Sequence, residues 1–350
     1  MITYVVTACL SFTGHFLIRN SERRGVDTRL CMLLPFVVMM LFADNTPDHK
    51  VYETAYYTGR APYFESGIKI ITELLKRIGI ENFFVFKCLI VALVIFTFCK
   101  WGKVVPNIAT TILLYNLFVQ FYDVIQMRYT IAEMLILLSL YFIIKKQLVV
   151  AIVTGVASIY FHRLALLPLL FLICIYFIRP KKDYSLRNTE TVVILTGGFI
   201  GVFLSKLIVG TIAESIPFFE RINMYMTGNT SIDSFLIWGG YEGFILFAMY
   251  YLGYNNFVKN PHVDNEKKAA INMLFRFMLY GIAVSGFLLY VQEFNRLYRL
   301  LFISGYLMFG IIEDSMEKTN RDVLFAMLSV ASIAFMAVAM LRGINFDTYW

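Results

Sequence analysis

A histidine and an arginine stand side by side in a long apolar part of the chain. His162 and Arg163 interrupt the stretch "ASIYFHRLALLP", inside a run from about Leu148 to Ile178 that is otherwise almost wholly apolar. Histidine can exchange a proton near neutral pH, and a guanidinium group binds phosphate oxygens in pairs while staying charged. A charged side chain within a bilayer is costly unless it is paired or reaches water. The pair therefore calls for a functional or topological explanation.

Three further segments place polar side chains at the ends of apolar blocks: "DNTPDHKVYETAYYTG", "YDVIQMRYTIAE" and "QEFNRLYR". If the helices bundle, these segments meet His162 and Arg163 at one mouth. Its cations, tyrosines and histidine suit an anionic, polyhydroxylated substrate such as a lipid-linked sugar pyrophosphate. The candidate site residues are Asp48, Tyr52, Tyr56, Gln126, Arg128, His162, Arg163, Glu293, Arg296 and Arg299.

The composition identifies the class of protein that positions these residues. The chain has 350 residues, of which 59% are hydrophobic and 16% charged, and its mean hydropathy is +0.68. A soluble domain is about a quarter charged. The apolar residues come in blocks of about 15–22, the length needed to cross hydrocarbon. The sequence therefore predicts an all-α, polytopic membrane protein, with residues 1–350 as a single transmembrane domain.

We expect about twelve spans, and several are short. Short or interrupted helices at membrane depth are tolerated where they line a cavity. The expected spans cover residues 3–18, 29–43, 82–98, 104–121, 130–144, 147–160, 164–178, 190–211, 234–254, 271–290, 300–312 and 323–341.

The basic connectors alternate along the chain and set the expected orientation. Connectors such as "RNSERRGVDT", "RPKKDYSLRNT" and "NNFVKNPHVDNEKKAA" are rich in Lys and Arg, so the positive-inside rule assigns them to the cytoplasm. Both termini and all four polar segments then face outward. Topology does not require arginines there, so Arg128, Arg163, Arg296 and Arg299 indicate function. Snorkelling of Arg128 and Arg296 to outer headgroups is the alternative.

One outward segment, residues 44–81, holds a loop and an amphipathic helix. In "ESGIKIITELLKRIG" the apolar residues recur at helical spacing, with charged residues on the opposite face. We expect this helix to lie on the outer membrane interface and to end at Gly79.

Several classes of site are not indicated by the sequence. The five cysteines show neither CxxC nor Cys/His spacing, which argues against a metal site or a disulfide framework. Phosphate-loop, dinucleotide-binding and HExxH motifs are missing from the sequence. The net charge of +7 lies in short clusters between apolar blocks, so it does not indicate nucleic-acid binding. We expect no cofactor, no metal and a donor that arrives already attached to lipid.

The order of these elements resembles the EpsG family of Wzy-like polymerases of bacterial exopolysaccharide, capsule and O-antigen. The resemblance rests on "PDHKVYETAYYTG", "FESGIKIITELLKRIG", "QMRYTIAEMLILLSLYFIIKK", "IVTGVASIYFHRLALLPLLFL" and "NRLYRLLFISG", from about Asp44 to Gly305. Members commonly continue after the histidine as H-x-S-A-L. This chain has Leu164 at the serine position, which cannot contribute a hydroxyl.

The resemblance implies a metal-independent glycosyltransferase of GT-C-like or related helical architecture in the bacterial inner membrane. Such an enzyme joins oligosaccharide repeat units carried on undecaprenyl pyrophosphate at the outer face. A chain-length regulator and a flippase are candidate partners. Two other classes stay open: a flippase or exporter of lipid-linked oligosaccharide, and an O-antigen ligase-like or monomer-adding GT-C transferase.

Each candidate residue can be given a role in breaking a glycosyl–pyrophosphate bond. Arg128, Arg296 and Arg299, with Arg163 as a further candidate, would stabilise the departing pyrophosphate. His162 is the first candidate for the proton acceptor of the attacking hydroxyl, with Asp48 or Glu293 as alternatives. Tyr52, Tyr56 and Gln126 would line the path of the sugar.

Overall fold

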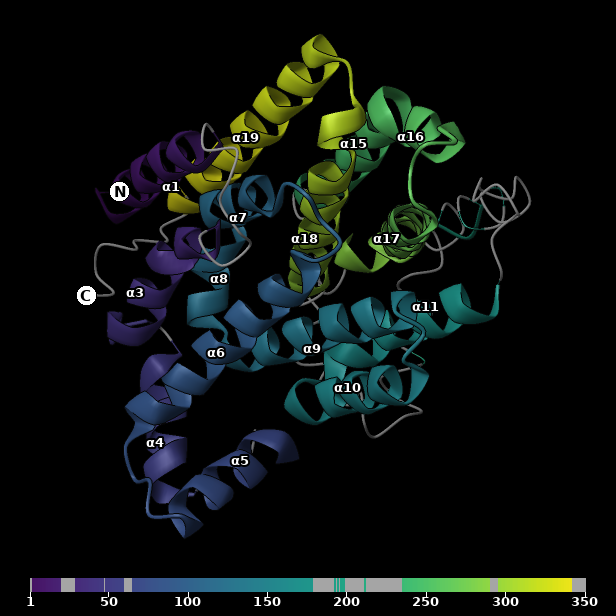
Figure 1. Cartoon of the computed structure of the whole chain (residues 1–350). Helices are drawn as coiled ribbons and strands as arrows, with labels where there is room; N and C mark the ends of the chain where they lie inside the picture. The colour runs from purple at the N-terminus through teal and green to yellow at the C-terminus, as the bar shows by residue number, and fades with distance from the viewer. Residues whose placement is uncertain are drawn as a thin grey trace. The chain divides into compact units, whose positions relative to one another are not determined.

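The computed structural model describes residues 2–19, 29–46, 48–59, 65–178, 235–289 and 295–341, with isolated positions between 192 and 211. Helix makes up 88% of this described part, which contains no strand (Figure 1). The chain divides into two compact units. The first comprises Met1–Leu169, Phe309–Ile311 and Phe325–Trp350, and the second comprises Leu170–Met308 and Ile312–Leu324.

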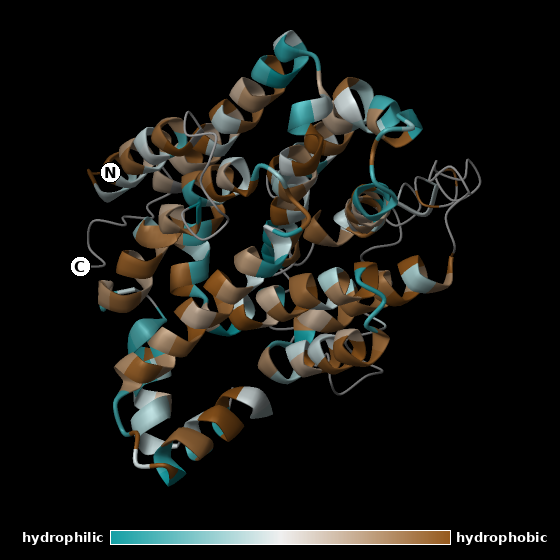
Figure 2. Cartoon of the chain, in the orientation of Figure 1, coloured by the Kyte–Doolittle hydropathy of each residue, from teal (hydrophilic) through white to brown (hydrophobic). Residues whose placement is uncertain are grey.

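Four helical stretches in the described residues are long and apolar enough to cross a membrane. They are α6 (Phe83–Trp101), α9 (Met127–Ile144), the stretch Phe235–Lys259, and α19 (Lys318–Leu341) over Lys318–Val338. A fifth candidate is the pair α7 (Ile108–Leu117) and α8 (Val119–Ile125), bent by 63°. Figure 2 shows hydrophobic residues along most of α6 and α9. The all-helical membrane class is confirmed, while the expected span at 190–211 lies mostly outside the described residues.

Shorter apolar helices occupy other expected spans. They cover Ile2–Ile18 within α1 (Ile2–Arg19), Cys31–Phe42, which is a 3₁₀ turn (Cys31–Leu33) continued by α3 (Leu34–Phe42), α10 (Leu148–Phe161) and Arg163–Phe177. The expected span at 104–121 is not one straight helix but the bent pair α7 and α8, which meet at Phe118. Backbone groups freed at such a bend must find partners elsewhere, because hydrocarbon offers none.

Long-range hydrogen bonds join the helices of the first unit. The Trp101 indole of α6 donates to the backbone oxygen of Leu137 in α9 at 3.2 Å. The Tyr4 hydroxyl of α1 donates to the backbone oxygen of Leu117 in α7 at 3.1 Å. Both donors are buried aromatic side chains, so each contact satisfies a polar atom that would otherwise be orphaned at membrane depth.

The helical break expected at His162 is present. α10 ends at Phe161, His162 is extended (φ −156°, ψ 123°), and a 3₁₀ turn (Arg163–Ala165) leads into α11 (Leu166–Phe177). A Cβ added to Gly155 would lie 2.7 Å from Leu169 Cδ1, although the two residues lie on opposite sides of the break. The break between the expected spans 147–160 and 164–178 is therefore present, and Leu169 packs back onto Gly155.

Residues 44–81 form two helices, α4 (His49–Thr58) and α5 (Ser66–Arg77). Gly59 and Gly79 follow them with φ of +66° and +80°, a region that favours glycine, so the predicted end of α5 near Gly79 is confirmed. The Lys76 ammonium donates to the backbone oxygen of Tyr57 at 2.9 Å. The Tyr56 hydroxyl donates to the backbone oxygen of Ile80 at 3.0 Å, which ties α4 to the end of α5.

α5 presents three different faces, and Figure 2 shows both hydrophilic and hydrophobic stretches along it. Ile68, Thr72 and Leu75 are buried against the protein. Ile70, Leu74 and Ile78 are exposed apolar residues, while Lys69, Glu73 and Arg77 form a charged, exposed face. A helix with a buried face, an apolar outer face and a charged face suits the boundary between hydrocarbon and water.

The second unit contains the helical stretch Phe235–Lys259, which includes α15 (Gly240–Met249) and α16 (Asn255–Lys259), followed by α17 (Asn265–Ala283) and α18 (Asn295–Ile312). The Asp264 side chain caps α17 by accepting from the Glu266 N–H at 3.1 Å. The Tyr298 hydroxyl donates to the Gly281 backbone oxygen at 3.2 Å, which joins α18 to α17. Arg276 is buried, and its Nη1 donates to the Ile175 backbone oxygen at 3.3 Å.

The close approach of α5 to α10 gives a first prediction. A Cβ at Gly67 would lie 2.7 Å from the backbone oxygen of Tyr160, so Gly67→Ala must displace one of the two helices. We expect the substitution to destabilise the protein by about 1–3 kcal/mol, measured as a lower melting temperature in detergent. Gly243→Ala in α15 is the matched control, since nothing lies within 4 Å of its added Cβ. Equal melting temperatures for the two variants would contradict the packing described here.

Candidate functional site

The inner face of α4 carries a row of polar and aromatic side chains. His49, Tyr52, Glu53 and Tyr56 are spaced three and four residues apart, so they share one side of the helix. His49, Tyr52 and Tyr56 are buried, although the segment as a whole is polar. The row faces two charged groups on neighbouring helices, and together they form the candidate site.

The first charged group is Arg128, in the first turn of α9. Its Nη1 lies 2.5 Å from Oε2 of Glu65, a short charge-assisted contact. The guanidinium carbon lies 5.9 Å from the centre of the Tyr52 ring, within the range of cation–π attraction. The two ion-pair side chains are only 19% and 11% exposed, so water screens their attraction weakly. Arg128 is therefore held in one place by a carboxylate and an aromatic face.

The second charged group is Lys87 of α6, which the sequence analysis did not select. Its ammonium lies 2.7 Å from Oδ1 of Asp44, and the same oxygen lies 3.3 Å from Nε2 of His49. Nδ1 of His49 lies 3.9 Å from the Glu53 carboxylate. The Lys87 side chain is 2% exposed and that of Asp44 66%, so the lysine is buried along its length and reaches outward to its partner. The available signal was a cation near the start of an apolar helix, away from the basic residues at its other end.

The environment of His49 lowers the pKa of its imidazole below the usual value. Burial is the main cause, because it disfavours the charged ring, and the nearby Lys87 ammonium acts in the same direction. The carboxylates of Asp44 and Glu53 oppose the shift without reversing it. His49 is therefore biased towards its neutral form.

His162 lies at the same end of α9 as Arg128. Its ring meets the ring of Tyr129, the residue after Arg128, edge to face with centres 5.2 Å apart. Nδ1 of His162 accepts a hydrogen bond from the Leu164 backbone N–H at 3.3 Å. In the neutral ring the proton then resides on Nε2, which makes that atom a hydrogen-bond donor. Leu164 takes part through its backbone, so the contact does not require a serine at this position.

Four other predicted residues also belong to the first unit. Gln126 stands at the break between α8 and α9, where its backbone oxygen accepts from the Thr130 N–H at 3.1 Å. Asp48 is half-buried at the N-terminal end of α4, and its side chain does not cap that helix. Arg163 is half-buried in the turn after His162. Tyr56 is buried, and its hydroxyl bonds the Ile80 backbone as described above.

The remaining predicted residues belong to the second unit or lie outside the described residues. Arg296 and Arg299 lie on α18 in the second unit, where Arg299 is buried and Arg296 half-buried. Glu293 lies outside the described residues. A single mouth shared by all ten residues therefore stays a prediction. In the described part of the chain, no group of three or more His, Cys, Asp or Glu side chains could hold a metal ion.

The comparisons with known proteins give one match. A family model described as the EpsG family covers residues 28–349, nearly the whole chain. This is the family that the sequence motifs resemble, so the resemblance is confirmed. Curated proteins and solved structures give no significant match.

The lowered pKa of His49 predicts how stability depends on pH. A folded-state pKa below the unfolded value means that the unfolded state binds more protons on acidification. His49 therefore contributes stability above its unfolded pKa of about 6.5, and this is lost as the pH falls through that value. We expect His49→Gln to weaken the decrease in melting temperature between about pH 7.5 and 5.5.

The control for this measurement is His262→Gln, which removes an exposed imidazole outside the cluster. We expect its pH dependence to match that of the unmodified protein. An unchanged slope in His49→Gln would show that His49 is not the group responsible.

Proposed function

Because the chain belongs to the EpsG family, we propose that it polymerises lipid-linked oligosaccharide repeat units into a bacterial surface polysaccharide. Family membership and the membrane-spanning helices place it among membrane proteins of polysaccharide biosynthesis. The finer assignment is a glycosyltransferase that uses undecaprenyl-pyrophosphate-linked units at the outer face of the inner membrane. In this proposal both termini face outward, and the two units belong to one membrane domain of about twelve spans.

The observation that carries the proposal is the placement of Arg128. It is the residue that joins Glu65 and Tyr52 to the N-terminal end of a membrane-spanning helix, beside the Tyr129–His162 contact. A preorganised cation of this kind stabilises charge that develops during a reaction without reorganising at that moment. A departing pyrophosphate develops such charge. Arg163, in the adjoining turn, is a second candidate contact for the phosphates.

The reaction exchanges one bond at the sugar for another. The bond from the anomeric carbon to the pyrophosphate oxygen breaks, and its electron pair leaves with the pyrophosphate. A hydroxyl oxygen of the acceptor unit bonds to the anomeric carbon, and its proton passes to a base. Arg128 neutralises the charge on the leaving group, while Tyr52 and Gln126 border the path of the sugar.

The histidine tautomer changes the assignment of the base. Because Nδ1 of His162 accepts the Leu164 N–H, a neutral His162 offers Nε2–H as a donor. It is thus suited to hold a substrate oxygen rather than to take its proton. Asp48, half-buried at the end of α4 one turn before Tyr52, becomes the first candidate for the proton acceptor. Tyr56 serves to hold α4 in place.

Arg128→Ala should slow polymerisation by about 10²-fold or more, because it removes a charge that stabilises the leaving group. The measurement is the length distribution of glycan made from purified lipid-linked repeat units, resolved as a ladder on a gel. Arg77→Ala removes an exposed arginine of α5 and is the matched control. A full ladder from Arg128→Ala would overturn the assignment of this residue. In cells, loss of all surface glycan in a deletion strain would indicate a flippase or ligase, whereas single repeat units indicate a polymerase.

Two substitutions test which residue accepts the proton and which residue donates a hydrogen bond to the substrate. Asp48→Asn cannot accept the proton and should lower the rate by about 10²–10⁴-fold. His162→Gln retains an N–H donor and should cost less than His162→Ala. Rates from the same ladder assay across pH distinguish the roles, since the loss of the base removes the acidic limb of the profile. If Asp48→Asn keeps that limb and His162→Gln loses it, the two assignments must be exchanged.

A further inference from the structure

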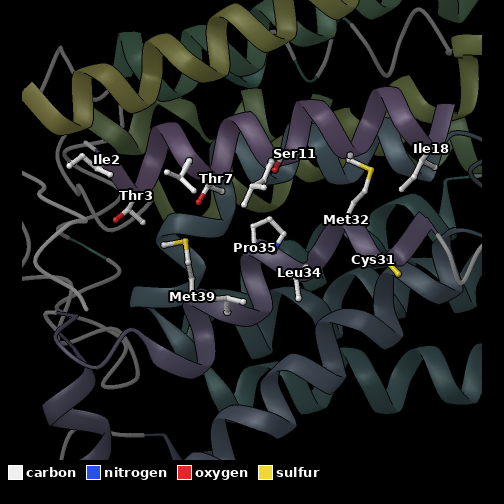
Figure 3. Close-up of a pocket in the computed structure, with 14 residues that line it drawn as sticks. Ile2, Thr3, Thr7, Ser11, Ile18, Cys31, Met32, Leu34, Pro35 and Met39 are labelled. Carbon is white, nitrogen blue, oxygen red and sulfur yellow. The ribbon is translucent and has the colours of Figure 1, made fainter. Parts of the chain in front are cut away.

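A narrow apolar groove runs between α1 and α3 in the first unit. Figure 3 shows its lining residues along the gap between the two helices, from Ile2, Thr3 and Met39 at one end to Ile18 and Cys31 at the other. The rim residues Ile2, Val6, Leu10, Leu34 and Val38 are exposed, so the groove opens at the surface. Thr7, Ser11, Met32 and Met39 are buried and form its floor.

A buried amide fixes the two walls of the groove. Nδ2 of Asn116 in α7 donates to Oγ of Ser11 in α1 at 3.1 Å and to the backbone oxygen of Met32, just before α3, at 2.7 Å. The Tyr4–Leu117 hydrogen bond ties α1 to α7 at a second point. The spacing of α1 and α3 is therefore set by hydrogen bonds to a third helix, and the groove is a built feature of the unit.

The dimensions of the groove fit a single hydrocarbon chain. Its volume is about 480 Å³. From Ile2 to Ile18 an α-helix rises about 24 Å, so a further helix about 10–12 Å across lying along the groove would need about 1,900–2,700 Å³. The groove is several times smaller than that, so it suits an extended hydrocarbon chain and not a helix.

One end of the groove leads to the candidate site. Met39 lies in the last turn of α3, and helical geometry continues through the Ala43 N–H, which donates to the Met39 backbone oxygen at 3.0 Å. Asp44 follows directly and binds Lys87 and His49. The rise from Met39 to Ala43 is about 6 Å, and Asp44 is the next residue. An apolar channel thus ends close along the chain to a charged cluster, the pattern that complements an amphiphile with an apolar chain and a phosphorylated head.

We infer that the groove between α1 and α3 holds the isoprenoid chain of the lipid-linked substrate, with the pyrophosphate end towards Asp44 and Lys87. This inference rests on the proposed function for the identity of the chain. The Lys87 ammonium binds Asp44 at that end of the groove, and it can exchange the exposed Asp44 carboxylate for a phosphate oxygen. The flexible thioethers of Met32 and Met39 adapt to a methyl-branched chain.

The test uses the purified full-length protein and a photoreactive geranylgeranyl pyrophosphate. We expect labelling on peptides of α1 and α3, with competition by unlabelled geranylgeranyl pyrophosphate but not by phosphatidylglycerol. Gly14 lies in the wall of the groove, where its added Cβ would face Met32 Cγ at 3.9 Å. Gly14→Leu should fill the groove and reduce labelling by about tenfold or more.

Thr13→Leu is the matched control, since Thr13 is exposed on α1 and does not line the groove. We expect the photoreactive lipid to label this variant to the same extent as the unmodified protein. Val38→Trp obstructs the groove from the exposed rim of α3, so it answers the question if Gly14→Leu fails to fold. Labelling away from α1 and α3, equal competition by phosphatidylglycerol, or full labelling of the obstructed variants would overturn the inference.

The polymerisation assay separates the two proposals. A protein that makes a glycan ladder but is not labelled at α1 and α3 loses the groove assignment and keeps the function. A protein that is labelled there but makes no ladder keeps an isoprenoid site and loses the polymerase function.

Discussion

The ion pair between Arg128 and Glu65 is the interaction on which the candidate site depends. It joins the residue just before α5 to the first turn of α9, two elements far apart in sequence. Removing one partner of such a shielded pair leaves an uncompensated charge, at a cost of about 3–5 kcal/mol. Tyr52 lies over the guanidinium and Tyr129 follows it, so α4 and His162 are both positioned relative to this pair. A shift of Glu65 would therefore change the positions of Arg128 and Tyr52.

The same ion pair raises the question of how an arginine already bound to a carboxylate can bind phosphate. A guanidinium group has five N–H donors in a fixed fork, and Glu65 engages Nη1. A carboxylate on one arm orients the planar group and restricts its rotamers, so less entropy is lost when a second anion binds. In the proposed reaction Glu65 is then a positioning residue: it offsets part of the positive charge of Arg128 but fixes the orientation of the guanidinium group. An unpaired surface arginine would keep its full charge but would have no fixed orientation.

The local sequence pattern was sufficient to predict the helices and their ends, but not the ion pairs between them. The apolar periodicity and Gly79 predicted α5 and its end, and the gap between the expected spans 147–160 and 164–178 predicted the break at His162. Asp44 with Lys87, and Glu65 with Arg128, are 43 and 63 residues apart, so periodicity holds no information about them. In the sequence, Lys87 is visible as a cation near the start of an apolar helix. Whether it has an acidic partner depends on where α3 ends, because Asp44 follows that helix, and the end of α3 is set by tertiary packing.

Under the proposed function, one requirement accounts for both the polar cluster and the apolar groove. A lipid-linked glycan must keep its chain in hydrocarbon while its phosphates are held by cations, so its site must join an apolar channel to a charged pocket without a break. In this chain the junction is the short link from α3 to α4, where Met39 faces the groove, Asp44 binds Lys87, and His49 begins the polar face of α4. Burial and the nearby Lys87 ammonium lower the pKa of His49, which favours the neutral imidazole. A protonated histidine there would compete for the Asp44 carboxylate, so the neutral ring leaves Lys87 as the charged partner of Asp44.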